Sequence, residues 1–191
     1  MSMTLYGSLP SPYVRRIRML MDGMDYQFEA VEIYDDEKRA EYATVSPIKK
    51  LPVLVDGDQT VFDSHVICEY LRRKEGMPEQ PIDEQNLIAA VDGVNDSLIV
   101  LFMGKRSGLE VSEDTLIFKL QLGRIPDTLA WLEKQAEQGA FAEWHMATIA
   151  LISLLDWAEF RELYDFSGYP ALLAARKQHQ DRTIVKETYP Q

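Results

Sequence analysis

The spacing of apolar residues along the chain changes near residue 76. Before that point, short apolar runs bounded by turn residues predict strands, and longer amphipathic runs predict helices. The strands are predicted at residues 3–6, 26–33, 51–55 and 59–62, and the helices at about residues 11–23, 35–42 and 63–74. A helix between the first two strands implies a parallel pair, and the Asp56-Gly57-Asp58 turn implies an antiparallel hairpin. This part of the chain is therefore predicted to be α/β, with a small mixed sheet and helices on its faces.

The strand signals stop after a linker at residues 77–82, which contains Pro78 and Pro81. Helices are predicted beyond it at about residues 83–105, 113–138, 145–160 and 169–180, the second of them with a bend at Pro126. The third is apolar on all sides, which is typical of a helix in the middle of a bundle. We therefore expect an α/β domain over residues 1–76 and an all-α domain over residues 83–191.

The composition limits the partners that the protein can have. The chain of 191 residues carries a formal net charge of −11, and no run of Lys and Arg forms a basic patch. Nucleic acid and anionic membranes are therefore not expected as partners. One cysteine, Cys68, and three scattered histidines predict neither a disulfide framework nor a metal site. Neither a leader peptide nor a membrane span is expected, which makes the cytoplasm the expected location.

The first candidate for chemistry is the pair Ser11-Pro12, which begins a helix directly after the first predicted strand. This arrangement leaves a hydroxyl at the positive end of a helix, where an anion is held favourably. We hypothesise that the anion is the thiolate of a bound cofactor. Taken alone, the serine is more simply a helix N-cap.

Two further stretches also allow both a structural and a ligand-binding interpretation. In Lys50-Leu51-Pro52, the proline either begins a strand, where proline is allowed, or marks a bend that exposes the backbone for binding. In Asp63-Ser64, the serine is expected to cap the helix that follows, and its hydroxyl and the nearby N–H groups can take a carboxylate. An acidic residue is also common at a helix start, because of the helix dipole.

In this order and at this spacing, residues 11–18, 50–54 and 63–64 resemble the glutathione transferase superfamily in its serine-type form. The resemblance covers the whole chain and includes the tail at residues 181–190. It implies a thioredoxin-like first domain, a helical-bundle second domain, a homodimer, and glutathione as co-substrate without a metal. The implied activity is transfer: the glutathione thiol is activated as a thiolate and attacks a small electrophile. A glutathione-dependent isomerase, dehalogenase or disulfide reductase is an alternative, as is a non-enzymatic binding or regulatory protein on the same fold.

The resemblance also assigns roles to individual residues. Ser11 would donate a hydrogen bond to the glutathione sulfur, with Tyr13 as a second-rank donor. Leu51, ahead of a cis-Pro52, would pair its backbone with the cysteinyl part of glutathione. The remaining contacts of glutathione would be made by Lys50 with the glycine carboxylate, Ser64 with the γ-glutamyl carboxylate, and Asp63 with the γ-glutamyl ammonium.

Three other residues are weaker candidates for the thiol-activating position. The position that a tyrosine-type transferase would use falls on Gly7, so strand alternation points Tyr6 to the opposite face. Ser8 caps no helix. Cys68 lies beside the apolar face of a helix and is expected to pack in the core.

The pocket for the electrophile would be lined by Leu9, Phe102, Met103 and Arg106. The sequence by itself favours bundle core for Phe102 and Met103. Arg106 would either hold an acidic substrate or make a surface ion pair.

One departure from the family pattern concerns the start of the helix predicted at residues 145–160. The family usually begins it with a Ser/Thr-x-x-Asp capping box, and this chain has His145 and Thr148 at those two positions. We therefore expect neither of the usual reciprocal bonds at this helix start.

Overall fold

The computed structural model describes residues 3–32, 42 and 45–191, which form two compact units. The first unit combines Met1–Glu79 with Arg182–Gln191, and the second is Gln80–Asp181. The last ten residues, which the sequence assigned to the helical domain, thus pack with the α/β unit instead. The short helix predicted at residues 35–42 lies, apart from Tyr42, outside the described residues.

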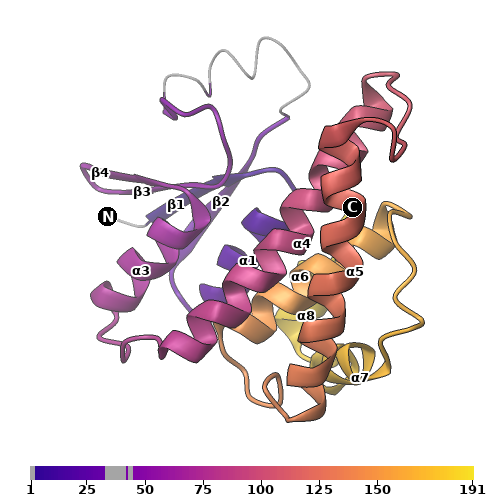
Figure 1. The fold of residues 1–191 in the computed structure, drawn as a ribbon. Helices are drawn as coiled ribbons and strands as arrows, with labels where there is room; N and C mark the ends of the chain where they lie inside the picture. Colours follow the sequence, from indigo (N-terminus) through magenta and orange to yellow (C-terminus); the bar gives the residue numbers. More distant parts are fainter. Residues whose placement is uncertain (1–2, 33–41, 43–44) are drawn as a thin grey trace. The chain divides into compact units, whose positions relative to one another are not determined.

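The first unit contains a four-stranded mixed sheet with the strand order β2-β1-β3-β4 (Figure 1). Its strands are β1 (Met3–Gly7), β2 (Tyr26–Ala30), β3 (Val53–Asp56) and β4 (Gln59–Phe62). Strand β1 pairs in parallel with β2 and antiparallel with β3, which pairs antiparallel with β4. The predicted parallel pair and hairpin are therefore confirmed. Strand β3 begins two residues later than predicted.

Helices α1 (Pro12–Leu20) and α3 (Ser64–Lys74) pack against each other, and α1 lies close to β1 at Gly7. A Cβ atom added to Gly7 would lie 2.2 Å from a methyl carbon of Val14, so this approach requires glycine. The buried face of α3 is formed by Ser64, Ile67, Cys68 and Leu71. Val66, on the same helix, is 54% exposed.

A short helix that the sequence did not predict, α8 (Thr183–Glu187), joins the first unit through Arg15 of α1. Arg15 is 1% exposed, and its Nη2 donates to the Val185 carbonyl at 3.0 Å. Its Nε donates to Thr188 Oγ1 at 3.4 Å. A buried arginine is uncommon unless it is paired, and here the end of the chain supplies the acceptors.

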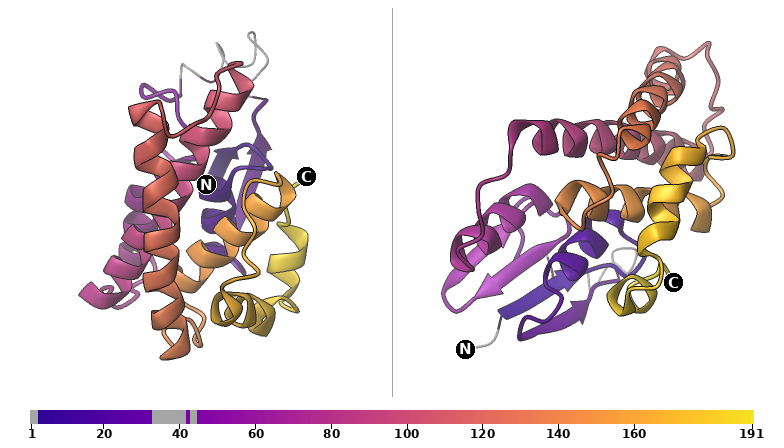
Figure 2. Two further views of the ribbon diagram at one scale, coloured as in Figure 1. Left: turned by 45° about the vertical axis from the view of Figure 1, so that its right-hand side comes forward. Right: turned by 90° about the horizontal axis from the view of Figure 1, so that it is seen from below.

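The second unit consists of α4 (Ile82–Arg106), α5 (Leu116–Glu137), α6 (Met146–Phe160) and α7 (Pro170–His179). Helices α4 and α5 run side by side, and α6 packs against α4 (Figures 1 and 2). All residues of α6 from Met146 to Ala158 are buried, which confirms the predicted central helix. Helix α5 continues through Pro126. By length and composition alone α4 is apolar enough to cross a membrane, a property that it shares with core helices of soluble proteins.

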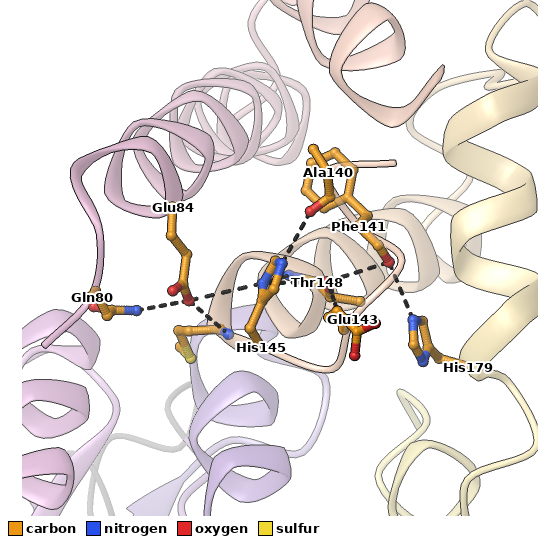
Figure 3. Close-up of polar contacts among 9 residues, drawn as sticks. Gln80, Glu84, Ala140, Phe141, Glu143, His145, Thr148 and His179 are labelled. Carbon is orange, nitrogen blue, oxygen red and sulfur yellow. Dashed lines mark hydrogen bonds and ion pairs between the residues drawn. The ribbon is translucent and has the colours of Figure 1, made fainter. Parts of the chain in front are cut away.

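The start of α6 is capped by groups from outside the usual motif (Figure 3). His145 Nδ1 accepts from the Thr148 N–H at 3.3 Å, so the expectation that both capping bonds are lost is wrong for this one. Glu84 of α4 accepts from the Met146 N–H at 3.0 Å. Gln80 Nε2 donates to the same Glu84 oxygen at 3.1 Å. An imidazole ring and a carboxylate from a neighbouring helix thus satisfy N–H groups that α6 cannot satisfy internally.

Helix α7 is capped in the same manner. Its preceding residue, Tyr169, makes no side-chain capping bond. Instead, the two carboxylate oxygens of Glu133 in α5 accept from the N–H groups of Ala171 and Leu172, at 2.7 and 3.0 Å. In this unit, two helices are therefore capped by a glutamate of another helix: α6 by Glu84 and α7 by Glu133.

In the first unit, a carboxylate also joins the hairpin to α3. Asp56, the last residue of β3, accepts from the Tyr70 hydroxyl at 2.7 Å and forms an ion pair with Lys74. The hydrogen bond from Lys74, followed by that from Tyr70, lowers the pKa of Asp56 below its ordinary value. The same contacts raise the pKa of both partners.

We expect Glu84→Ala and Glu133→Ala each to lower the free energy of unfolding by about 1 kcal/mol, because each removes the acceptor at a helix start. Urea denaturation followed by circular dichroism measures this change. Glu137→Ala is the matched control, since this exposed glutamate lies one turn beyond Glu133 on α5. Equal destabilisation by Glu137→Ala and Glu133→Ala would contradict the capping role.

The second prediction concerns pH and Asp56. Its pKa is depressed in the folded state, so its contribution to stability is present above its unfolded value of about 3.9 and is lost as pH falls through the folded value. We expect the urea midpoint of Asp56→Asn to fall less between about pH 5 and pH 2 than that of the wild type. Parallel pH profiles for the two proteins would show that the Lys74 and Tyr70 contacts do not stabilise the folded state.

Candidate functional site

The register of the sheet brings the three stretches singled out in the sequence to one place. Tyr6 in β1 pairs with Val53 in β3, and Val53 pairs with Phe62 in β4. Strand β1 runs toward this row and so does β4, whereas β3 starts from it. The loop after β1, the residues before β3 and the start of α3 therefore meet at the same end of the sheet (Figure 1).

Ser11 is the N-cap of α1, as predicted. Its backbone is extended (φ −75°, ψ 124°), and its Oγ accepts from the Val14 N–H at 3.3 Å. A hydroxyl carries one hydrogen and two lone pairs. The capping bond uses a lone pair, so it leaves the hydrogen for donation to a further group. Ser11 is half-buried at the positive end of the helix.

The neighbours of Ser11 have different surroundings. The Tyr13 ring lies beneath the Arg16 guanidinium, 4.9 Å from its carbon to the ring centroid. Leu9 is 36% exposed in the loop. The Cα of Gly7 lies against the Val14 side chain of α1, so alternation places Tyr6 on the opposite face of the sheet. The rejection of Tyr6 agrees with this geometry.

The second stretch begins with an exposed Lys50 and a half-buried Leu51, and ends at a buried Pro52. The Leu51–Pro52 peptide bond is cis, as the family resemblance implies. The Lys50 carbonyl accepts hydrogen bonds from the hydroxyls of Tyr42 and Ser46. Burial raises the pKa of Tyr42, which keeps its hydroxyl protonated as a donor. Sequence reasoning missed both hydroxyls, because neither lies in a motif or follows an apolar period.

The third stretch differs from the prediction by one residue. Asp63, not Ser64, is the N-cap of α3, and its Oδ1 accepts from the His65 N–H at 2.9 Å. Asp63 has a positive φ of 76°, and Ser64 is the buried first residue of the helix. A carboxylate has about four lone-pair positions, so Asp63 can cap the helix and still accept from a ligand.

The residues predicted to line an electrophile pocket fall into both units. Leu9 belongs to the first, whereas Phe102, Met103 and Arg106 lie together in the last turn of α4 in the second. Met103 is 45% exposed, so the interpretation of this residue as bundle core is wrong.

Three residues lie close to the half-buried Phe102 ring. Trp157 packs edge-on at a centroid distance of 6.3 Å. The guanidinium carbons of Arg106 and Arg161 lie 5.7 and 5.6 Å from the ring centroid. The end of α4 therefore presents an aromatic ring with two cations beside it. Within the described ranges, no three His, Cys, Asp or Glu residues are grouped to hold a metal ion.

Comparison with known proteins shows which family this chain resembles in sequence and fold. Residues 5–79 match the family model "Glutathione S-transferase, N-terminal domain". A zeta-class glutathione S-transferase from Euphorbia esula is 28% identical over 92% of this chain and 83% of its own length. The uncharacterised GST-like protein YibF from Escherichia coli (strain K12) is 28% identical over 84% of both chains. The match to glutathione S-transferase 4 from Zea mays is 37% identical, but it spans only 37% of this chain and 33% of that protein.

Solved structures extend the similarity to the full length. The crystal structure of a glutathione S-transferase from Methylobacillus flagellatus KT, with GSH bound, matches 100% of both chains with a TM-score of 0.87 and 27% identity. A thioredoxin-like unit with a mixed four-stranded sheet, followed by an all-helical unit, is the glutathione transferase fold. Residues 5–79 thus match the N-terminal domain of the glutathione S-transferase family, and the whole chain has the fold of that superfamily.

The capping bond of Ser11 should contribute to stability, independently of any role of this residue in catalysis. Ser11→Ala removes the acceptor for the Val14 N–H and is expected to lower the free energy of unfolding by about 1 kcal/mol. Ser11→Asn keeps an N-cap of equal rank, so its urea midpoint should stay close to that of the wild type. A loss of stability in Ser11→Asn equal to that in Ser11→Ala would contradict this interpretation.

Proposed function

We propose that the protein is a glutathione transferase that holds glutathione at the sheet end defined above and activates its thiol for attack on a small electrophile. The observation that carries the proposal is Ser11, whose capping bond to the Val14 N–H uses only a lone pair of its oxygen. In this proposal, the hydroxyl hydrogen of Ser11 donates to the glutathione sulfur. The M. flagellatus relative, solved with GSH bound, supports glutathione as the ligand.

The chemistry that Ser11 supplies is a shift of the thiol toward its reactive form. An ordinary thiol has a pKa of about 8.5, so little of it is ionised at neutral pH. A hydroxyl donor and the positive end of α1 both favour the thiolate over the thiol. The Val14 N–H, by donating to the serine oxygen, makes that hydroxyl a stronger donor. Tyr13 remains the second-rank donor in this proposal.

The rest of glutathione is proposed to lie across the other two stretches. Leu51 pairs through its backbone with the cysteinyl part, and Lys50 offers its ammonium to the glycine carboxylate. At the γ-glutamyl end, the Asp63 carboxylate accepts a hydrogen bond from the ammonium. The γ-glutamyl carboxylate is bound by Ser64 and by the N–H groups of the first turn of α3.

For the electrophile, we propose that the end of α4, with Phe102, Met103 and Arg106, supplies the binding surface. Two arginines beside Phe102 favour an electrophile that is aromatic, acidic or both. As in the family, we propose that the protein acts as a homodimer in the cytoplasm. A non-enzymatic glutathione-binding protein is the alternative, and the tests below separate the two.

The binding test is retention of the wild-type protein on immobilised glutathione and elution by the free tripeptide. Asp63→Ala should elute early, because it removes the proposed partner of the ammonium. Asp58→Ala is the matched control, since Asp58 lies in the hairpin turn at the opposite end of β4. Failure of the wild type to bind would rule out both the transferase and the non-enzymatic glutathione-binding alternative.

The chemical test uses conjugation of a chloronitroaromatic substrate and the ultraviolet absorbance of the bound thiolate against pH. A hydrogen bond to a charged group contributes about 1.5–3 kcal/mol, so Ser11→Ala should lose roughly tenfold to a hundredfold in rate. The thiol pKa should rise toward about 8.5 in this variant. Ser11→Thr, which keeps the hydroxyl, should retain most of the rate. A wild-type rate in Ser11→Ala would remove Ser11 from this role, and binding without conjugation by any form would favour the non-enzymatic alternative.

A further inference from the structure

Two hydroxyl groups meet at the carbonyl oxygen of Lys50, directly ahead of Leu51. The Tyr42 hydroxyl donates to this oxygen, and Ser46 Oγ donates to it at 3.3 Å. Tyr42 is 6% exposed and Ser46 is fully buried. A carbonyl oxygen has two lone pairs, so the two donors occupy both. The side chain of Lys50 is exposed, and it is the peptide group that is held.

The two donors are themselves fixed by backbone bonds. The Ser46 N–H donates to the Tyr42 carbonyl at 3.1 Å, and the Lys49 N–H donates to the Ser46 carbonyl at 3.1 Å. Main-chain bonds therefore link Tyr42, Ser46 and Lys49, and the two hydroxyls bond to the Lys50 carbonyl. The set formed by Tyr42, Ser46 and the Lys50 carbonyl acts as one unit. We call this set the carbonyl clamp.

The clamp determines the direction of a second group. The Lys50 carbonyl and the Leu51 N–H belong to one peptide unit, which is trans, since the cis bond in this stretch is the next one along. In a planar trans peptide, the C=O and N–H bonds point in opposite directions. Two donors on the oxygen therefore aim the Leu51 N–H away from the clamp. They also polarise the unit, because a carbonyl that accepts hydrogen bonds makes its N–H a better donor.

We propose that Tyr42, together with Ser46, is a positioning residue that aims and polarises the Leu51 N–H for the cysteinyl part of glutathione. The inference rests on the proposed function, and it concerns the affinity for glutathione rather than the activation of the thiol, which belongs to Ser11. Neither hydroxyl touches the ligand in this proposal, since both are turned toward the Lys50 carbonyl. The clamp acts through Leu51 alone.

The test compares Tyr42→Phe with Tyr70→Phe in the full-length protein. Each change removes one hydroxyl and keeps the ring, but Tyr70 donates to Asp56 at the far end of β3. Titration calorimetry with glutathione should show roughly fivefold weaker binding by Tyr42→Phe, the loss of one hydrogen bond of ordinary strength. Tyr70→Phe should bind glutathione within about twofold of the wild type, because its hydroxyl lies outside the clamp.

Kinetics and spectroscopy separate positioning from general loosening of the structure. Tyr42→Phe should raise KM for glutathione roughly fivefold and leave kcat at saturating glutathione within about twofold. The amide proton resonance of Leu51 should move upfield, because its peptide unit is less polarised. Should Tyr42→Phe fold poorly, Ser46→Ala tests the same oxygen, and Ser46→Thr should restore the affinity.

The outcomes distinguish this inference from the function beneath it. A wild-type protein that does not bind glutathione overturns the proposed function and the clamp with it. Binding by the wild type, with equal affinities for Tyr42→Phe and Tyr70→Phe, overturns only the clamp. A fall in kcat without a change in KM in Tyr42→Phe also overturns it, because the hydroxyl would then act on the chemical step.

Discussion

The first N–H groups of a helix lack acceptors within that helix, and side chains supply acceptors at the starts of α1, α3, α6 and α7. In the first unit, Ser11 and Asp63 cap the helices that directly follow them, and both starts lie at the same end of the sheet. Two positive helix ends are thereby gathered beside the Leu51 backbone. In the second unit, Glu84 and Glu133 reach from one helix to cap another. The same requirement thus produces a candidate anion site in one unit and cross-links in the other.

Much of the first unit could be predicted from the sequence, because its signals are local. Alternating apolar residues, the Asp56-Gly57-Asp58 turn and Ser-Pro at the helix start each act over a few positions, and the structure confirms them. The one-residue error at Asp63 has a physical cause. Both Asp and Ser are good N-caps, and the choice depends on where the helical backbone begins, which the sequence does not reveal; it begins at Ser64.

What could not be predicted depends on contacts between residues distant in sequence. Glu84 caps a helix that starts 62 positions later, and no local sequence pattern predicts such a pairing. His145 is a poor cap by residue type, yet its ring places Nδ1 where a serine oxygen would otherwise lie. The hydrogen bonds from Tyr42 and Ser46 to the Lys50 carbonyl also follow no local pattern in the sequence. For Met103, apolarity suggested the core, but the end of a helix can expose one apolar residue beside a half-buried one.

The buried arginine of α1 has a consequence for the order in which the protein is made. Arg15 lies one turn after Ser11, and two of its acceptors are Val185 and Thr188. These residues leave the ribosome only after the entire helical unit. Domains usually fold as units in the order of their synthesis. Here the first unit is completed only after the helical unit has been synthesised. Its buried Arg15 guanidinium, near the candidate site, donates hydrogen bonds to residues that follow that unit in the chain.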